Sequence, residues 1–458
     1  MLVITLDSTR ASIVAMQSTT TSVSNPSRAD PRTGTATPMH DAAAVTAEAH
    51  GRWAIAIAGA VSLAVAMGIG RFAFTPLLPM MLADHVIDLH AASWLASANY
   101  LGYLAGALLC TFQPWIRARA PWLPAINAPQ LVRGGLVATG LLTLGMALPL
   151  PPAWPVLRFA AGVASAVVFV YTSGWCLAQL ARLQASATGG AIYTGPGAGI
   201  VVSGLAVGAM IAWHWSAAAG WLIFGALSFV LTATVWRTFR DAPAQNRGTP
   251  AAAVSASPQP APQHHHGRAE IASLTFAYGL AGFGYIITAT FLPVIARGTL
   301  AGSPWLDFFW PIFGFGVVVG ALLATRLRVS GDLRRLLALA YLMQAAGIGA
   351  SLWSPTLAGF AVGSLLLGLP FTAITFFAMQ EVRRLRPASA ASTMGLLTAM
   401  YGIGQIVGPP LAAWMLRTTG SERAGFTVSL EIAAGALLLG VVVYLAMSKV
   451  FPVRPRSR

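Results

Sequence analysis

Charged side chains are scarce in this chain of 458 residues: Asp, Glu, Lys and Arg together make up 9%, against about 25% in an ordinary soluble domain. Apolar residues make up 56%, and the mean hydropathy is +0.69. This composition excludes a soluble globular protein and indicates a polytopic membrane protein. The net charge of +15 does not indicate nucleic-acid binding, because the basic residues are spread between apolar segments and form no compact basic domain.

Cysteine is also scarce. Cys110 and Cys176 both fall inside apolar segments, so we expect packing roles and neither a disulfide framework nor a metal site. The chain has no Gly-x-x-x-x-Gly-Lys-Ser/Thr motif, which argues against ATP hydrolysis. No histidine stands beside a carboxylate in the apolar segments, so we expect no enzyme and no cofactor. The adjacent histidines 264–266 lie in a polar stretch, where we interpret them as incidental.

Long apolar segments dominate the rest of the chain, each of about 20 residues, the length that a bilayer of about 30 Å requires. The sequence predicts an all-α protein of twelve transmembrane helices in two sets of six. The first set comprises Trp53–Leu82, Ala92–Phe112, Leu131–Leu150, Trp154–Leu180, Ala187–Trp213 and Trp215–Trp236, and the second comprises Ile271–Ile295, Trp305–Thr325, Leu336–Trp353, Thr356–Gln380, Ala391–Leu416 and Gly425–Ser448.

The segments outside these spans complete the predicted organisation. Residues 1–52 lack a signal-peptide core and are interpreted as a disordered cytoplasmic tail. Residues 237–270 are rich in Pro, Ala and Gln and form a flexible cytoplasmic linker. It separates an N-terminal bundle, 53–236, from a C-terminal bundle, 271–448, which precedes a basic tail, 449–458.

The distribution of Lys and Arg predicts the orientation. With the N-terminus inside, the cytoplasmic connections and the C-terminal tail hold twenty of these residues, and the outer loops hold Arg297, Arg417 and Arg423. This excess places both termini in the cytoplasm of a cell whose inner, plasma membrane holds the protein.

The two halves repeat one another. A shift of 214 residues aligns Gly68 with Gly282 and Gly102 with Gly316, and a shift of 213 aligns Gly195-Pro196 with Gly408-Pro409. An even number of helices per half gives both copies the same orientation, with a central cavity between them.

Several of these motifs resemble a known family. The stretch Arg158–Ala166 on the fourth span and Gly195–Gly199 on the fifth are similar to motifs of the major facilitator superfamily. The stretches Gly68–Pro79 and Asn99–Tyr103 resemble its YbfB/YjiJ branch, whereas Gln113–Arg119 replaces the usual acidic loop signature. The resemblance implies a monomeric transporter that works by alternating access, with the first, fourth, seventh and tenth helices lining the cavity.

Two arginines within the spans are the leading site candidates. An arginine at the centre of a lipid-facing helix costs about 3 kcal/mol or more, so Arg71, 18 residues into the first span, marks a cavity, a partner or a ligand. Arg71 and Arg158 would give the outer half of the cavity a positive potential suited to a carboxylate or phosphate. Alternatively, backbone carbonyls near Pro76 or a carboxylate neutralise Arg71, and Arg158 lies at the lipid headgroups.

Further polar and aromatic residues are candidates for binding a substrate. Tyr278 and Tyr285 share a helix face, and Tyr285 is the repeat counterpart of Arg71; both could equally fill helix contacts. The other candidates are Asn99, Tyr193, Thr372 and Gln405.

Helix breakers and buried acids supply two more predictions. Hinge or close-packing roles are expected for Gly68, Gly70, Pro76, Gly195, Pro196, Gly199, Gly408 and Pro409. Three acids, Glu431, Asp307 and Glu381, are the candidates for proton coupling.

The sequence therefore predicts a secondary active transporter of a small polar, anionic or zwitterionic metabolite, with proton coupling as a further hypothesis. The alternative is a proton-driven exporter of apolar or cationic drugs, which the aromatic residues favour and Arg71 disfavours.

Overall fold

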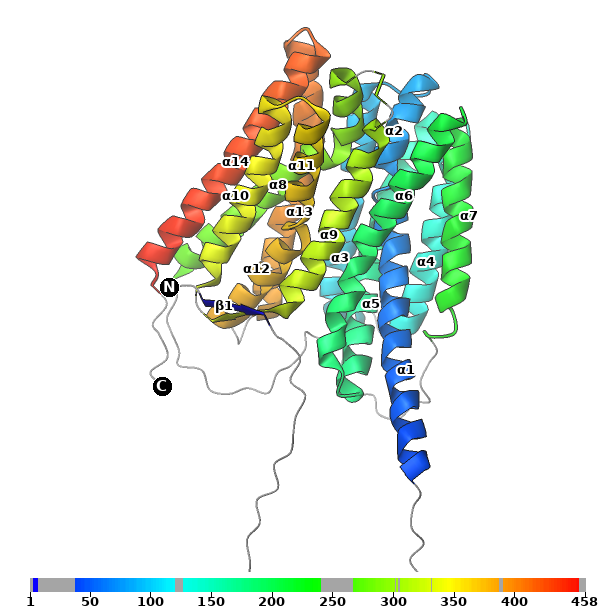
Figure 1. The fold of residues 1–458 in the computed structure, drawn as a ribbon, viewed down its shortest axis with the longest axis vertical. Coiled ribbons are helices and arrows are strands. Elements are labelled where there is room, and N and C mark those ends of the chain that lie inside the picture. Colours follow the sequence, from blue (N-terminus) through cyan, green and yellow to red (C-terminus); the bar gives the residue numbers. More distant parts are fainter. Residues whose placement is uncertain are drawn as a thin grey trace, which may run out of the picture.

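The protein is described by a computed structural model covering residues 3–6, 38–119, 127–239, 267–300, 302–303, 305–330, 332–386 and 390–452. Two helical bundles stand side by side, with their long helices running in nearly the same direction (Figure 1). The first bundle contains α1 to α7, and the second contains α8 to α14. Most of the predicted linker, including histidines 264–266, lies outside the described residues.

The N-terminal bundle corresponds to the six spans predicted before the linker. Its helices are α1 (Pro38–Leu63), the π-helix η1 (Ala64–Ile69), α2 (Phe74–Ala83), α3 (Leu89–Arg119), α4 (Ala128–Gly145), η2 (Pro151–Ala153), α5 (Trp154–Arg182), η3 (Ser186–Thr194), α6 (Gly195–Ala212) and α7 (Ala217–Val235).

The C-terminal bundle repeats this plan. Its helices are α8 (Arg268–Thr299), η4 (Leu306–Phe308), α9 (Phe309–Arg326), α10 (Leu333–Trp353), α11 (Leu357–Gly368), α12 (Phe371–Leu385), α13 (Ala390–Thr418) and α14 (Glu422–Val450). A short strand, β2 (Leu327–Ser330), pairs antiparallel with β1 (Val3–Leu6).

Eleven helices of the described residues are long and apolar enough to cross a membrane. The predicted third span, Leu131–Leu150, corresponds to α4, which is 18 residues long and lies against α5 and α7. Pro129, Gln130 and Arg133 occupy its first turns and lower its hydropathy. Thus α4 belongs to the bundle because it packs against α5 and α7, although its composition is less apolar than that of the neighbouring helices.

The first helix begins earlier than the sequence predicted. It starts at Pro38, inside the segment interpreted as a disordered tail, and β1 also lies in that segment. Proline suits the first turn of a helix, and the alanine-rich stretch that follows Pro38 has high helix propensity.

Glycine contacts reproduce the repeat in three dimensions. A Cβ on Gly68 would lie 2.4 Å from the Gly199 Cα on α6, and one on Gly282 would lie 2.2 Å from the Tyr401 carbonyl on α13. These are equivalent helix pairs, the first with the fifth span of each half. The aligned glycines therefore lie between equivalent helix pairs in the two bundles, although their partner residues are not aligned with one another.

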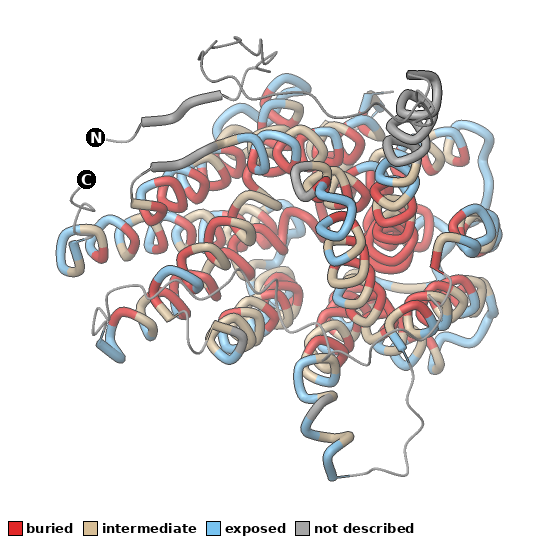
Figure 2. Tube along the Cα trace, turned by 90° about the horizontal axis from the view of Figure 1, so that it is seen from below, coloured by how far each residue is buried: buried red, intermediate tan, exposed pale blue. Residues whose placement is uncertain are grey.

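The halves meet along a seam in which α3 contacts α13, α6 contacts η4 and α9, η3 contacts α9, and α2 contacts α8. Buried residues gather in the interior of the molecule, whereas exposed residues lie mostly at its periphery (Figure 2). Large apolar side chains such as Val156, Val230 and Val442 are among those exposed. Such an apolar periphery suits lipid rather than water.

Candidate functional site

The first span is interrupted where its glycines lie. At the end of η1 the amides bond five residues back, from Gly70 N–H to the Val65 carbonyl at 2.9 Å and from Phe72 N–H to the Met67 carbonyl at 3.0 Å. The Thr75 amide then bonds to the Phe72 carbonyl at 3.1 Å instead of the Arg71 carbonyl four residues back. π-Helical turns of this kind frequently occur at functional sites.

Arg158 supplies hydrogen bonds to this interruption. Its guanidinium, on α5, donates from Nη1 to the Gly70 carbonyl at 3.3 Å and from Nη2 to the Arg71 carbonyl at 3.2 Å. It also lies 4.8 Å from the ring centroid of Phe74. Carbonyls freed inside a membrane need such partners. Arg158 is buried among helices.

Arg71 points across the seam to the second half. Its Nη2 donates to Oε1 of Gln405 on α13 at 2.7 Å, and its guanidinium carbon lies 4.1 Å from the ring centroid of Tyr103 on α3. Among the described residues, no carboxylate lies within ion-pair distance of Arg71, and its Nε atom is buried without a hydrogen-bond partner. A buried cation without a counter-charge is costly.

The second half supplies aromatic rings to the same place. Tyr285 on α8 stacks on Tyr401 at 5.9 Å and meets Phe371 edge-on at 5.0 Å. Tyr278 lies 4.9 Å from Tyr401, and its hydroxyl donates to Thr375 at 3.0 Å. The Gln405 amide nitrogen donates to the Tyr285 hydroxyl, so Arg71, Gln405 and the rings form one connected group.

We call Arg71, Gln405, Tyr285, Tyr401, Tyr103 and Phe371 the Arg71 cluster. Tyr103, Tyr401 and Phe371 keep part of their surface exposed, whereas Arg71 and Gln405 are buried. The cluster therefore combines an uncompensated guanidinium with ring faces and hydroxyl groups. Such groups can hold the acidic end and the body of a small molecule.

The structure places the remaining predicted binding residues differently. Asn99 donates to the Arg158 backbone carbonyl at 2.9 Å, which joins α3 to α5 behind the cluster. Tyr193 packs against Phe169 in a separate group of side chains that includes Cys176. Thr372 follows Phe371 directly, and its buried hydroxyl has no hydrogen-bond partner among the described residues.

Sequence reasoning did not select Tyr100 and Tyr103, although both face Arg71. Their ring centroids lie 5.2 and 4.1 Å from its guanidinium carbon. The signal that could have found them is their spacing of three residues, which puts both rings on one helix face.

The predicted hinge residues occupy tight contacts. A Cβ on Gly195 would lie 2.1 Å from the Ala60 carbonyl, and one on Gly408 would lie 2.3 Å from the Ile286 side chain. Pro196 is in the first turn of α6, and Pro409 lies inside α13. Gly70 and Pro76 flank the interrupted segment that contains Arg71.

The three predicted proton-coupling acids lie outside the Arg71 cluster. Glu431 is exposed on α14. Glu381 is buried at the end of α12, where it pairs with Arg384 at 3.1 Å and lies 3.6 Å from Arg334. Arg334 also pairs with Glu270 at 3.0 Å and thereby ties α10 to α8.

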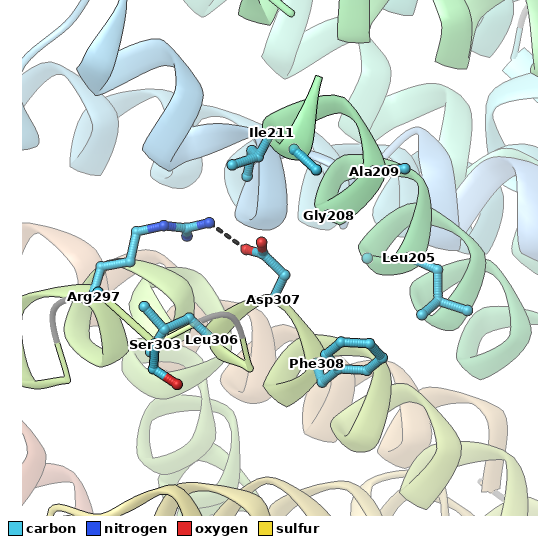
Figure 3. Close-up of a pocket in the computed structure, with 12 residues that line it drawn as sticks. Leu205, Gly208, Ala209, Ile211, Arg297, Ser303, Leu306, Asp307 and Phe308 are labelled. Atoms are coloured by element: carbon cyan, nitrogen blue, oxygen red, sulfur yellow. Dashed lines mark hydrogen bonds and ion pairs between the residues drawn. The ribbon is translucent and has the colours of Figure 1, made fainter. Parts of the chain in front are cut away.

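Asp307 pairs with Arg297 beside a cavity (Figure 3). This cavity has a volume of about 750 Å³ and lies between α6 and the segment that begins α9. Its α6 wall is formed largely by small residues, including Gly204, Gly208 and Ala209.

Comparisons with known proteins agree with this architecture. Residues 63–445 match the family model described as "Uncharacterised MFS-type transporter YbfB". The fold is similar to that of the nucleoside transporter NupG, with a TM-score of 0.63, 15% sequence identity and coverage of 88% of this chain and 100% of that one. A point mutant of NupG gives a TM-score of 0.66 and 15% identity, with coverage of 86% and 99%. No curated protein matches the chain.

The family match thus identifies a multi-pass membrane transporter of the MFS type, a secondary transporter and not an enzyme. The chain belongs to the YbfB family of these transporters.

Proposed function

We propose that this transporter moves a small anionic or zwitterionic metabolite by alternating access and that Arg71 binds its acidic group. The observation that carries the proposal is the buried Arg71 guanidinium, which has hydrogen-bond and ring partners but no carboxylate among the described residues. A bound carboxylate or phosphate would supply the missing charge through strong hydrogen bonds.

The membrane orientation and the coupling ion form a second part of the proposal. The excess of arginine in the predicted inner loops supports an inner-membrane orientation with both termini cytoplasmic. Glu381 and Asp307 pair with arginines outside the Arg71 cluster, and Glu431 is exposed. If transport is coupled to protons, the simplest carrier of the proton is therefore the acidic group of the substrate itself. Collapse of a pH gradient across vesicles should then reduce uptake of the substrate.

A ligand screen tests the substrate class. Thermal unfolding of the purified protein is followed with organic acids, amino acids, sugars and cationic drugs, in parallel for Arg71→Ala. A ligand at a hundred times its Kd should stabilise the wild type by about 2.7 kcal/mol, and Arg71→Ala should lose this effect for anions. Arg326→Ala, at an exposed position on α9, is the matched control and should respond as the wild type does.

The alternative function predicts a different pattern. The rings of Tyr278, Tyr285 and Tyr401 could accept an apolar cation. If cationic drugs alone stabilise the protein and Arg71→Ala leaves their effect intact, the exporter function replaces our proposal.

A further inference from the structure

We propose that Gln405 is a built-in surrogate for the substrate's carboxylate: without cargo, its amide oxygen holds Arg71, and the cargo displaces it. This inference rests on the proposed function, because it assigns the unoccupied form of the same site. Gln405 comes from α13 in the second half, whereas Arg71 belongs to the first half.

The geometry of the contact resembles that of an acid bound to arginine. Oε1 of Gln405 accepts from Nη2 of Arg71 at 2.7 Å, and both side chains are buried. This distance lies at the short end of the range for guanidinium–carboxylate hydrogen bonds. The amide oxygen therefore occupies a position at which a carboxylate oxygen would fit.

The amide differs from a carboxylate chiefly in charge. It satisfies one N–H group of Arg71 but supplies no negative charge, and the Arg71 Nε atom still has no partner among the described residues. A carboxylate can accept from two guanidinium donors at once and neutralises the cation. Replacement of the amide by a carboxylate ligand is therefore favourable, whereas the amide alone keeps Arg71 oriented.

Tyr285 gives Gln405 a second contact. The Gln405 amide nitrogen donates to the Tyr285 hydroxyl on α8, within the second half. This bond does not depend on Arg71, so Gln405 keeps a partner when it leaves the guanidinium. Ligand binding would thus remove a hydrogen bond between the halves and preserve one within the second half, which couples occupancy to their relative movement.

Two substitutions separate a surrogate from a direct ligand contact. Gln405→Glu places a carboxylate on Arg71 permanently and should weaken binding of carboxylates at least tenfold. Gln405→Met keeps length without a polar group and should bind carboxylates as tightly as the wild type or up to tenfold more tightly. The probes are benzoate, succinate and glutamate, with inorganic phosphate as a second kind of anion, and the measurement is titration calorimetry.

A ligand-free measurement accompanies the titrations. Gln405→Glu should raise the unfolding temperature of the unliganded protein, and this gain should vanish in an Arg71→Ala background. Gln344→Glu is the control for a buried carboxylate: the Gln344 amide donates to the Leu367 carbonyl at 3.3 Å, away from the Arg71 cluster. That variant should unfold at a lower temperature than the wild type.

The outcomes distinguish the two proposals. If no anion binds the wild type, the proposed function is contradicted. Even then, stabilisation by Gln405→Glu that disappears in the Arg71→Ala background would still support a position beside Arg71 that accepts a carboxylate. If the wild type binds an anion and Gln405→Met loses this binding tenfold or more, Gln405 contacts the substrate directly and the surrogate role is overturned. Unchanged binding by Gln405→Glu, or no stabilisation, overturns it as well.

Discussion

Arg71 and Arg158 are both buried arginines, yet their guanidinium groups have different partners. Arg158 donates to two backbone carbonyls of the interrupted first span, whereas Arg71 reaches a side chain of the other half. Because the Arg158 bonds end on the backbone of Gly70 and Arg71, they hold the segment from which the Arg71 side chain projects. Arg158 is in this respect a positioning residue.

Arg158→Gln should therefore destabilise the protein by about 2–3 kcal/mol, the cost of leaving buried carbonyls without a charged donor, and should also weaken anion binding. Thermal unfolding and titration of the purified variant measure both effects. Arg133→Gln is the matched control, since Arg133 also donates to a carbonyl, that of Trp236, but at an exposed position. Equal losses in the two variants would contradict the positioning role.

The sequence selected Arg71 as a candidate because a cation within an apolar span is energetically costly, and its role in binding stays a prediction. The hydrogen bonds from Arg158 to the first span could not be predicted, because carbonyls freed by a π-helical turn have no sequence signature. The contact between Arg71 and Gln405 could not be predicted either, because the two residues are 334 positions apart in the sequence. Tyr103 was detectable only through its spacing from Tyr100.

At the scale of elements, glycine decides how closely helices approach. The predicted spans agree with the helices within a few residues in most cases, because apolar length is directly visible in a sequence. The start of α1 at Pro38 was not predicted, since an alanine-rich polar segment is compatible with helix or coil. The glycines that the 214-residue repeat aligns lie between equivalent helix pairs in the two halves.

Gly102→Ala tests this packing. A Cβ there would lie 1.9 Å from the Phe159 carbonyl on α5, so the helices must separate, at a cost of about 1–3 kcal/mol or more. Gly134→Ala on α4 is the control, because no atom lies within 4 Å of its added Cβ. That variant should gain about 0.5–1 kcal/mol from helix propensity. Similar unfolding temperatures for the two variants would refute the packing argument.

For the whole molecule, side-chain hydrogen bonds across the seam identify the regions that would separate under the proposed alternating-access cycle. The Thr75 hydroxyl donates to the Ala289 carbonyl at 2.9 Å, joining α2 to α8. The Tyr100 and Thr290 hydroxyls meet at 2.9 Å, and Ser97 donates to the Ile406 carbonyl at 3.0 Å. These bonds lie between halves that an alternating-access cycle moves apart.

A covalent link at this contact should stop the cycle. We expect Thr75→Cys with Ala289→Cys, in a background in which Cys110 and Cys176 are replaced by serine, to be joined by a short, reducible thiol-reactive cross-linker. Counterflow of a stabilising anion in vesicles should then fall to background and return after reduction. Each single-cysteine variant serves as the control, and undiminished counterflow in the cross-linked protein would contradict separation of α2 from α8.

The correspondence between Arg71 and Tyr285 has a consequence for the cargo itself. The repeat places a cation in one half and a phenol at the matching position of the other, so the duplicated halves are no longer interchangeable. Under the proposed function, the acidic group faces the first half and the remaining body faces the second. A substrate bound in this way keeps its acidic group directed toward the first half throughout transport. It therefore crosses the membrane without rotating between the two halves.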